Sequence, residues 1–200
     1  MLVTAVHETV AQTLKHRTEK NHLALEELLL PVLRAIHTCD DYVSLLKAFY
    51  GYFKPVEEAI FRHVNERVLP DIQDRRKADY LLKDLSFLHQ QSQHLPLATE
   101  IPVMGNVYQA MGALYVLEGS TLGGRSITRM LLKNPQVNLQ TDQVQFFNGY
   151  GEATGKMWTS FVQVLNQLST NTVDVEAMVA AADQTFLLFK NWLQKQLVHE

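Results

Sequence analysis

A histidine and a carboxylate stand one helical turn apart near the start of the chain. His22 and Glu26 share one face of a predicted helix, with Leu25 and Leu29 beside them. An imidazole with apolar neighbours and a nearby carboxylate suits an axial ligand of heme iron, because one ring nitrogen binds the metal while the other needs an acceptor that fixes its tautomer. The alternative is a half-exposed histidine in a charged surface stripe. The chain has eight histidines, so this spacing alone is a weak signal.

The second feature is a glycine-rich segment inside a helical pattern, with Gly119, Gly123 and Gly124. Each glycine should cost about 1 kcal/mol relative to alanine, which is large against a total stability of roughly 5–15 kcal/mol. Gly119 and Gly123 lie four apart on one face, where a flat ligand could lie directly against the backbone. Close packing of two helices explains the same strip equally well. A helix end with an anion nest is a further alternative, and a phosphate loop is disfavoured because the Gly-Lys-Ser/Thr ending is missing.

Three segments, in order along the chain, resemble heme oxygenases. The first is similar to their proximal helix and reads Leu14-Lys15-x-x-Thr18-x-x-x-His22-x-x-x-Glu26. The second resembles the distal helix of the bacterial branch, notably the members associated with bacteriophytochromes, and reads Tyr115-x-Leu117-Glu118-Gly119-Ser120-x-Leu122-Gly123-Gly124-Arg125. The third fits their closing helix and reads Ala181-Ala182-x-x-Thr185-Phe186-x-x-Phe189-x-x-Trp192-Leu193. The resemblance therefore spans nearly the whole chain.

The resemblance implies a role for each matching residue. It makes His22 the iron ligand and Glu26 its neighbouring carboxylate, and it places Gly119 and Gly123 over the opposite heme face. The predicted catalytic residues are Gly119, Ser120 and Gly123, and the predicted heme-binding residues are His22, Glu26, Lys15, Tyr115, Gly119, Gly123, Gly124 and Phe186. Animal members carry an aspartate where Ser120 stands here, which leaves the route of protons to bound oxygen open. Serine with ordered water, or another group, could serve.

The implied activity is the oxidative cleavage of heme, as both cofactor and substrate, to biliverdin, carbon monoxide and ferrous iron with O2. No segment resembles a flavin, nicotinamide or iron–sulfur site, so a ferredoxin or flavoprotein reductase is the expected electron donor, and a bilin-binding photoreceptor is a candidate partner downstream. The heme propionates need cations or water. The candidates are Lys15, Arg17, Lys20, Arg125, Arg129 and Lys190, with Tyr115 as a hydrogen-bond donor.

Three other functions compete with this one. A non-catalytic heme carrier or sensor needs only His22 and the pocket. A di-iron oxygenase needs carboxylates from several helices and paired Glu-x-x-His motifs, of which the sequence holds one, Glu19 to His22. A helical interaction module predicts no heme affinity and gives no reason for mid-helix glycines. If His22 is not the iron ligand, His16 is the next candidate.

Helical periodicity runs through every long segment and predicts a single all-α domain, residues 1–200, of six or more helices. Pro31 should stop the first helix, and Pro55 should kink the second or mark a joint. We expect Asp40 and Asp41, Thr141-Asp142 and Asp174 to cap helices. The predicted helices cover 8–30, 40–60, 70–91, 105–132, 141–168 and 174–197, with a loop at 94–102. Heme should bind between the first helix and a glycine-kinked fourth.

Composition narrows the class of protein. Hydrophobic residues make up 46% and charged residues 20% of the chain, enough for one sizeable core. A net charge of −3 argues against a nucleic-acid partner, which would need a basic face. No apolar run approaches the roughly 20 residues that span a bilayer, and residues 1–12 lack the order of a signal peptide. Cys39 is the single cysteine, so no internal disulfide forms. These features predict a cytoplasmic protein without a membrane partner.

Overall fold

The computed structural model describes residues 8–90, 94–169 and 171–198, and these residues form helices and loops without a strand. The helices are α1 (Val10–Arg34), α2 (Cys39–Phe61), α3 (Asp79–Phe87), α4 (Val107–Leu132), α5 (Gln145–Asn148), α6 (Thr154–Leu168) and α7 (Thr172–Leu197). Short 3-10 turns lie at Ile72–Asp74, Thr141–Gln143 and Gly151–Ala153. The all-α prediction is confirmed. The expectation about a signal peptide falls largely on residues 1–7, which lie outside the described residues.

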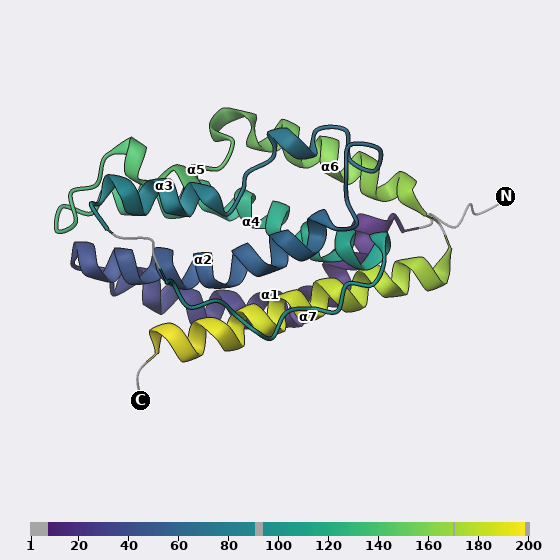
Figure 1. Ribbon diagram of the computed structural model, residues 1–200, viewed down its shortest axis with the longest axis horizontal. Coiled ribbons are helices and arrows are strands. Elements are labelled where there is room, and N and C mark those ends of the chain that lie inside the picture. The colour runs from purple at the N-terminus through teal and green to yellow at the C-terminus, as the bar shows by residue number, and fades with distance from the viewer. Residues whose placement is uncertain (1–7, 91–93, 170, 199–200) are drawn as a thin grey trace, which may run out of the picture.

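The long helices are stacked in three tiers (Figure 1). α1 and α7 run side by side along one side of the molecule, α3, α5 and α6 cover the opposite side, and α2 and α4 lie between them. α4 comes very close to its neighbours at two glycines. A Cβ at Gly112 would stand 2.1 Å from the Met178 carbonyl oxygen on α7, and one at Gly124 would stand 2.2 Å from the Phe147 carbonyl oxygen on α5. These two glycines let α4 pack backbone to backbone against both tiers.

α1 does not end at Pro31 as predicted. Thr9 caps its start in a capping box with Gln12, and the helix continues past the proline to Arg34. Pro31 lacks the N–H that would bond one turn back, but Leu33 and Ile36 are 7% and 2% exposed and hold the last turn on the core. Burial of these two side chains outweighs the single lost hydrogen bond.

Pro55 likewise leaves α2 uninterrupted, for a reason found elsewhere in the chain. A proline at this position leaves the Gly51 carbonyl without its helical donor. The Ala98 N–H donates to that oxygen at 2.8 Å, from the loop before α4, which passes in front of α7 in Figure 1. The predicted joint is therefore wrong, because tertiary structure supplies the missing hydrogen bond. The N-cap is Thr38, and Asp41 completes its capping box from inside the helix.

Two of the predicted helices are broken. The stretch from 70 to 90 forms a 3-10 turn and the short helix α3, with Arg75 and Arg76 in the irregular segment between them; the predicted end at Gln91 lies outside the described residues. The stretch from 141 to 168 breaks between α5 and α6. Gly149 and Gly151 have φ values of 57° and 56° there, a left-handed conformation that glycine adopts readily and that ends a helix. α7 begins at Thr172 with Asn171 as its cap, upstream of Asp174.

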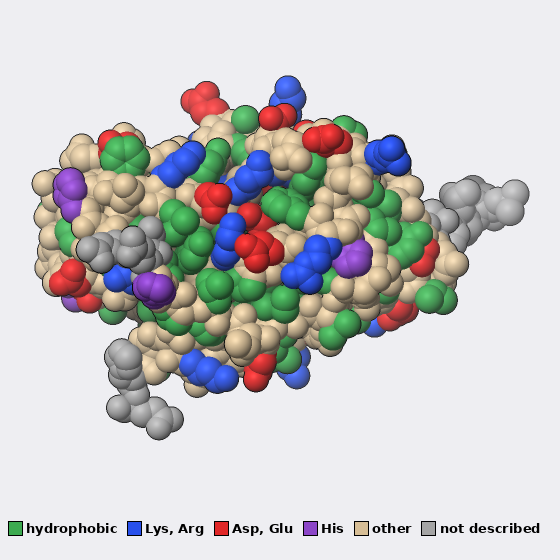
Figure 2. Space-filling model, viewed as in Figure 1, with side chains coloured by type: hydrophobic (Ala, Val, Ile, Leu, Met, Phe, Trp, Pro, Cys, Tyr) green, Lys and Arg blue, Asp and Glu red, His purple; other side chains and the backbone are tan. Residues whose placement is uncertain are grey.

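Side chains of both charges are interspersed on the face shown in Figure 2, in keeping with the small net charge. Within the described ranges, every helix is too short or too polar to cross a membrane.

Candidate functional site

A cavity of about 610 Å³ lies among α1, α2, α4, α5, α6 and α7. Its volume falls in the range of roughly 300–1,000 Å³ that is typical of small-molecule sites. Most of its lining is apolar or aromatic. Among the predicted site residues, those that line the cavity are Lys15, His22, Glu26, Tyr115, Gly119, Ser120, Gly123 and Phe186. The structure thus brings together segments that lie about a hundred residues apart in sequence, and of the predicted set only Gly124 lies elsewhere.

His22 is the one histidine among the described residues that lines the cavity. Its Nε2 lies 3.3 Å from Glu26 Oε1, and its ring centroid lies 5.2 Å from that of Phe186 on α7. Glu26 therefore lies beside one ring nitrogen of a half-exposed imidazole, and the other nitrogen has no partner in the described part of the chain. His16, the fallback candidate, is 65% exposed, pairs with Glu8 and does not line the cavity.

The glycines of α4 serve two different purposes. A Cβ at Gly123 would meet nothing within 4 Å, and one at Gly119 would meet only the indole of Trp158, at 3.7 Å. These two residues form a stretch of cavity wall without side chains. Gly124 packs against the Phe147 backbone. α4 is helical throughout this segment, so the interpretation as a helix end is wrong, and close helix packing accounts for Gly124 but not for Gly123.

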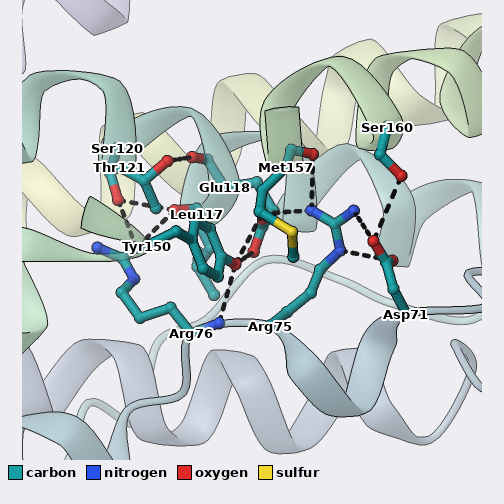
Figure 3. Close-up of polar contacts among 10 residues, drawn as sticks. All are labelled: Asp71, Arg75, Arg76, Leu117, Glu118, Ser120, Thr121, Tyr150, Met157 and Ser160. Atoms are coloured by element: carbon teal, nitrogen blue, oxygen red, sulfur yellow. Dashed lines mark hydrogen bonds and ion pairs between the residues drawn. The ribbon is translucent and has the colours of Figure 1, made fainter. Parts of the chain in front are cut away.

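Ser120 is held by a residue that the sequence analysis missed. Arg76 Nη2 donates to Ser120 Oγ at 2.7 Å and to the Leu117 carbonyl at 2.6 Å, and Ser120 Oγ itself donates to the Leu117 carbonyl at 2.7 Å (Figure 3). The guanidinium stacks on Phe146 at 4.2 Å. Arg76 as a whole residue is 9% exposed, and burial lowers the pKa of its guanidinium. Arg76 thus places a buried positive charge in the cavity wall next to Ser120.

A polar network, most of it buried, holds α4 in place next to Ser120 (Figure 3). Arg75 Nη1 donates to Glu118 at 2.6 Å, and its Nε and Nη2 donate to Asp71 at 2.9 and 2.8 Å. The Tyr150 hydroxyl donates to Glu118 Oε1 at 2.8 Å and accepts from the Arg76 N–H at 2.8 Å. Glu118 is 2% exposed, and burial raises the pKa of Tyr150. The network ties the distal helix to two separate loops.

Most of the candidate propionate ligands lie away from the cavity. Lys15 lines it, whereas Arg17 pairs with Glu176. The candidates that do not line it are Arg17, Lys20, Arg125, Arg129 and Lys190. Tyr115 lines the cavity and lies against Trp158 on α6, and burial raises the pKa of its phenol. The di-iron alternative finds no support, since the described residues hold no cluster of three or more histidine, cysteine or acidic side chains.

The comparisons with known proteins bear on the family and the fold. The family model for heme oxygenase matches residues 8–195. A heme oxygenase from Xanthomonas campestris is 30% identical over 155 residues, which cover 77% of this chain and 89% of that protein. The fold is similar to the NO- and CO-bound heme oxygenase from Neisseria meningitidis (TM-score 0.77, 21% identity, 96% of this chain and 93% of that one). It is also similar to a cyanobacterial heme oxygenase from Synechocystis solved in complex with heme (TM-score 0.72, 16% identity, 96% and 95% covered). A family match over nearly the whole chain, on a fold that these bacterial enzymes share, means that the chain belongs to the heme oxygenase family.

Proposed function

We propose that this heme oxygenase binds heme between α1 and α4 and opens it to biliverdin, with release of carbon monoxide and ferrous iron. The observation that carries the proposal is one cavity lined both by the His22 imidazole and by the side-chain-free surface of Gly119 and Gly123. A cavity of about 610 Å³ with aromatic walls suits a flat macrocycle. Lys15 adds a cation for its carboxylates. The residues present therefore fit an iron porphyrin.

On the proximal side, His22 would bind the iron and Glu26 would orient the imidazole. Their separation of 3.3 Å suits such an orienting contact, and an acceptor on the second ring nitrogen strengthens a histidine ligand. Phe186 limits the tilt of the ring from the α7 side. When bound, heme supplies the iron that activates O2 and the porphyrin that is oxidised.

On the distal side, the α4 wall of the cavity would select the ligand of the iron by its size and shape. The residues through which α4 lines the cavity include no carboxylate and no imidazole, so this helix presents no strong acid–base group to a small ligand. Gly119 and Gly123 would leave room for a small diatomic ligand beside a bound heme and would confine it there by shape. The Ser120 hydroxyl already donates its hydrogen to the Leu117 carbonyl. Toward the cavity it can accept a hydrogen bond from a water molecule, while Arg76 supplies the nearby positive charge.

The electrons would come from a separate protein, a ferredoxin or a flavoprotein reductase. A bilin-binding photoreceptor is a candidate recipient of the biliverdin, and recovery of iron is the alternative purpose of the reaction. The cytoplasmic location also stays a prediction.

The test is to add hemin to the protein, then ascorbate or a ferredoxin system, and to follow the absorption spectrum. We expect a Soret band that falls as biliverdin absorption rises. His22→Ala should lose or weaken the axial bond, whereas the matched variant His16→Ala should keep the wild-type spectrum. A Soret shift without bilin would favour a heme carrier, and an unchanged spectrum for His22→Ala would place the ligand elsewhere.

A further inference from the structure

A buried carboxylate outside the cavity holds the helix that forms one of its walls. Asp84 on α3 is 0% exposed and forms no ion pair with a described residue. Its Oδ1 accepts the Gln145 N–H at 2.9 Å, and its Oδ2 accepts the Phe146 N–H at 3.0 Å. An unpaired charge is costly to bury unless it is hydrogen-bonded, so these two bonds are the interactions that offset the burial of Asp84.

The segment that Asp84 holds is short. α5 is a single turn of four residues, Gln145–Asn148, and a helix of this length is unstable by itself. The first N–H groups of a helix have no acceptor within it, and here Asp84 accepts two of them. α3 lies beside α5 (Figure 1), close enough for a short side chain to reach. Asp84 therefore fixes the place where α5 begins.

α5 connects this carboxylate to the distal wall of the cavity. Phe146 and Phe147 both line the cavity. The guanidinium of Arg76 stacks on the Phe146 ring at 4.2 Å, and its Nη1 donates to the Phe146 carbonyl at 3.5 Å. The same guanidinium donates to Ser120 Oγ at 2.7 Å (Figure 3). A continuous line of contacts thus joins Asp84, which does not line the cavity, to a hydroxyl that does.

The position of α5 should depend on pH. Burial raises the pKa of Asp84 to about 6 against the effect of the two N–H donors, and the nearby Asp142 raises it further. The Tyr42 phenol on α2 also lies near the carboxyl, and burial raises its own pKa. The closed form of α5 therefore binds the proton of Asp84 more tightly than an opened form in which the carboxyl meets water. By linkage, α5 should open more easily as pH rises toward 6.

We propose that Asp84 is a positioning residue of the heme cavity: it holds α5, and through Phe146 it keeps Arg76 on Ser120. This inference rests on the proposed function and adds a residue from outside the cavity. If α5 moves, the Phe146 ring leaves the guanidinium, and Arg76 loses the support that aims it at Ser120. His22 lies on α1 and is untouched by such a movement, so turnover should change more than heme binding.

The first test needs no heme. Hydrogen exchange of the Gln145 and Phe146 amides in the ligand-free protein, corrected for the intrinsic rate, gives the opening constant of α5. Since the pKa of Asp84 is about 6 when buried and 3.8 otherwise, this constant should rise about tenfold from pH 5 to pH 7 in wild type. Asp84→Asn keeps the size of the side chain but has one acceptor oxygen. Its opening constant should be about tenfold above wild type at pH 5 and independent of pH. A wild-type constant that does not change with pH would overturn the inference.

The second test follows the contacts to Ser120. Bilin formation would be measured at saturating heme in wild type, Asp84→Asn, Ser120→Ala and the double variant. Each single change should slow it roughly three- to tenfold, the effect of one hydrogen bond, while the dissociation constant of heme from Soret titration changes less than about twofold. Because both changes act on the same Arg76 contact, the double variant should be no slower than the slower single one. Effects that multiply would overturn the inference.

Asp41→Asn is the matched control. Asp41 accepts the N–H groups of His37 and Thr38 at 3.0 and 2.8 Å at the start of α2, so this change also removes a capping carboxylate, but an exposed one that does not line the cavity. It should leave the opening of α5 and the rate of bilin formation at their wild-type values. A loss of rate equal to that of Asp84→Asn would overturn the inference.

The two tests separate this inference from the function on which it rests. Wild type that forms no bilin would overturn the proposed function, whereas hydrogen exchange in the ligand-free protein would still show whether Asp84 holds α5. Circular dichroism melts show whether each variant is folded. If Asp84→Asn does not fold, the pH dependence of exchange in wild type still decides the question.

Discussion

Gly123 should accept a methyl group that Gly124, the next residue, should not. A Cβ at Gly123 meets nothing within 4 Å, so Gly123→Ala gains helix propensity without a clash. That gain is about 1 kcal/mol. A Cβ at Gly124 would lie 2.2 Å from the Phe147 carbonyl oxygen, and relief of such overpacking costs roughly 1–3 kcal/mol. Gly124→Ala gains the same helix propensity, so the two alanine variants should differ in unfolding free energy by the overpacking cost alone, about 1–3 kcal/mol before relaxation.

Urea unfolding of the ligand-free protein measures this difference directly. Thermal melts should show Gly123→Ala about 2–4 °C above wild type, the shift expected per kcal/mol for a chain of this length, and Gly124→Ala below it. Bilin formation should nevertheless slow in Gly123→Ala, because its methyl group enters the cavity wall. Equal stability losses in both variants would refute the division of the α4 glycines into a cavity pair and a packing pair.

Three further changes probe the buried polar groups. Burial raises the pKa of Asp84 to about 6 from its ordinary 3.8. The folded state then keeps a proton that the unfolded state has lost, so the unfolding free energy should fall by about 2 kcal/mol as pH rises from 4 to 6.5. Asp84→Asn should flatten that slope in urea titrations across this range. Glu118→Gln removes the buried partner of Arg75 and should lower the unfolding free energy by about 3–5 kcal/mol; a change below about 1 kcal/mol would mean that the pair behaves as an exposed one. Ser120→Ala removes an acceptor from Arg76 and should cost about 1.5 kcal/mol in the same assay, and no loss at all would show that the Leu117 carbonyl alone satisfies the guanidinium.

The parts of the fold that sequence could predict are those set by local rules. Apolar periodicity predicted the long helices. The histidine–glutamate spacing of α1 is a weak signal by itself and the mid-helix glycines of α4 are ambiguous, so the candidate site residues were assigned their roles through the resemblance to heme oxygenases. The effect of the prolines on the helices could not be predicted from local rules. Whether Pro55 breaks α2 depends on Ala98, which donates to the Gly51 carbonyl from 47 positions away, and no local pattern contains that information.

Arg76 was missed for the same physical reason. An arginine pair in an amphipathic stretch looks like a solvated surface, since buried arginines are rare without partners. The acceptors of Arg76 are Leu117 and Ser120, 41 and 44 positions further along the chain. Only the approach of the irregular segment to α4 turns this residue inward, and a break in the predicted helix from 70 to 91 is what permits it.

α4 has a low intrinsic helix propensity, yet it can form a rigid cavity wall because neighbouring elements hold the helix on both sides of that wall. Four glycines in one helix cost about 4 kcal/mol against alanine. Two of them, Gly112 and Gly124, allow contacts with the backbones of α7 and α5 that any side chain would prevent. Between these contacts, Glu118 is bound by Arg75 and Tyr150. Gly119 and Gly123 therefore lie in a segment restrained before, within and after the cavity. A wall without side chains can keep its shape because neighbouring elements, and not its own sequence, hold it in place.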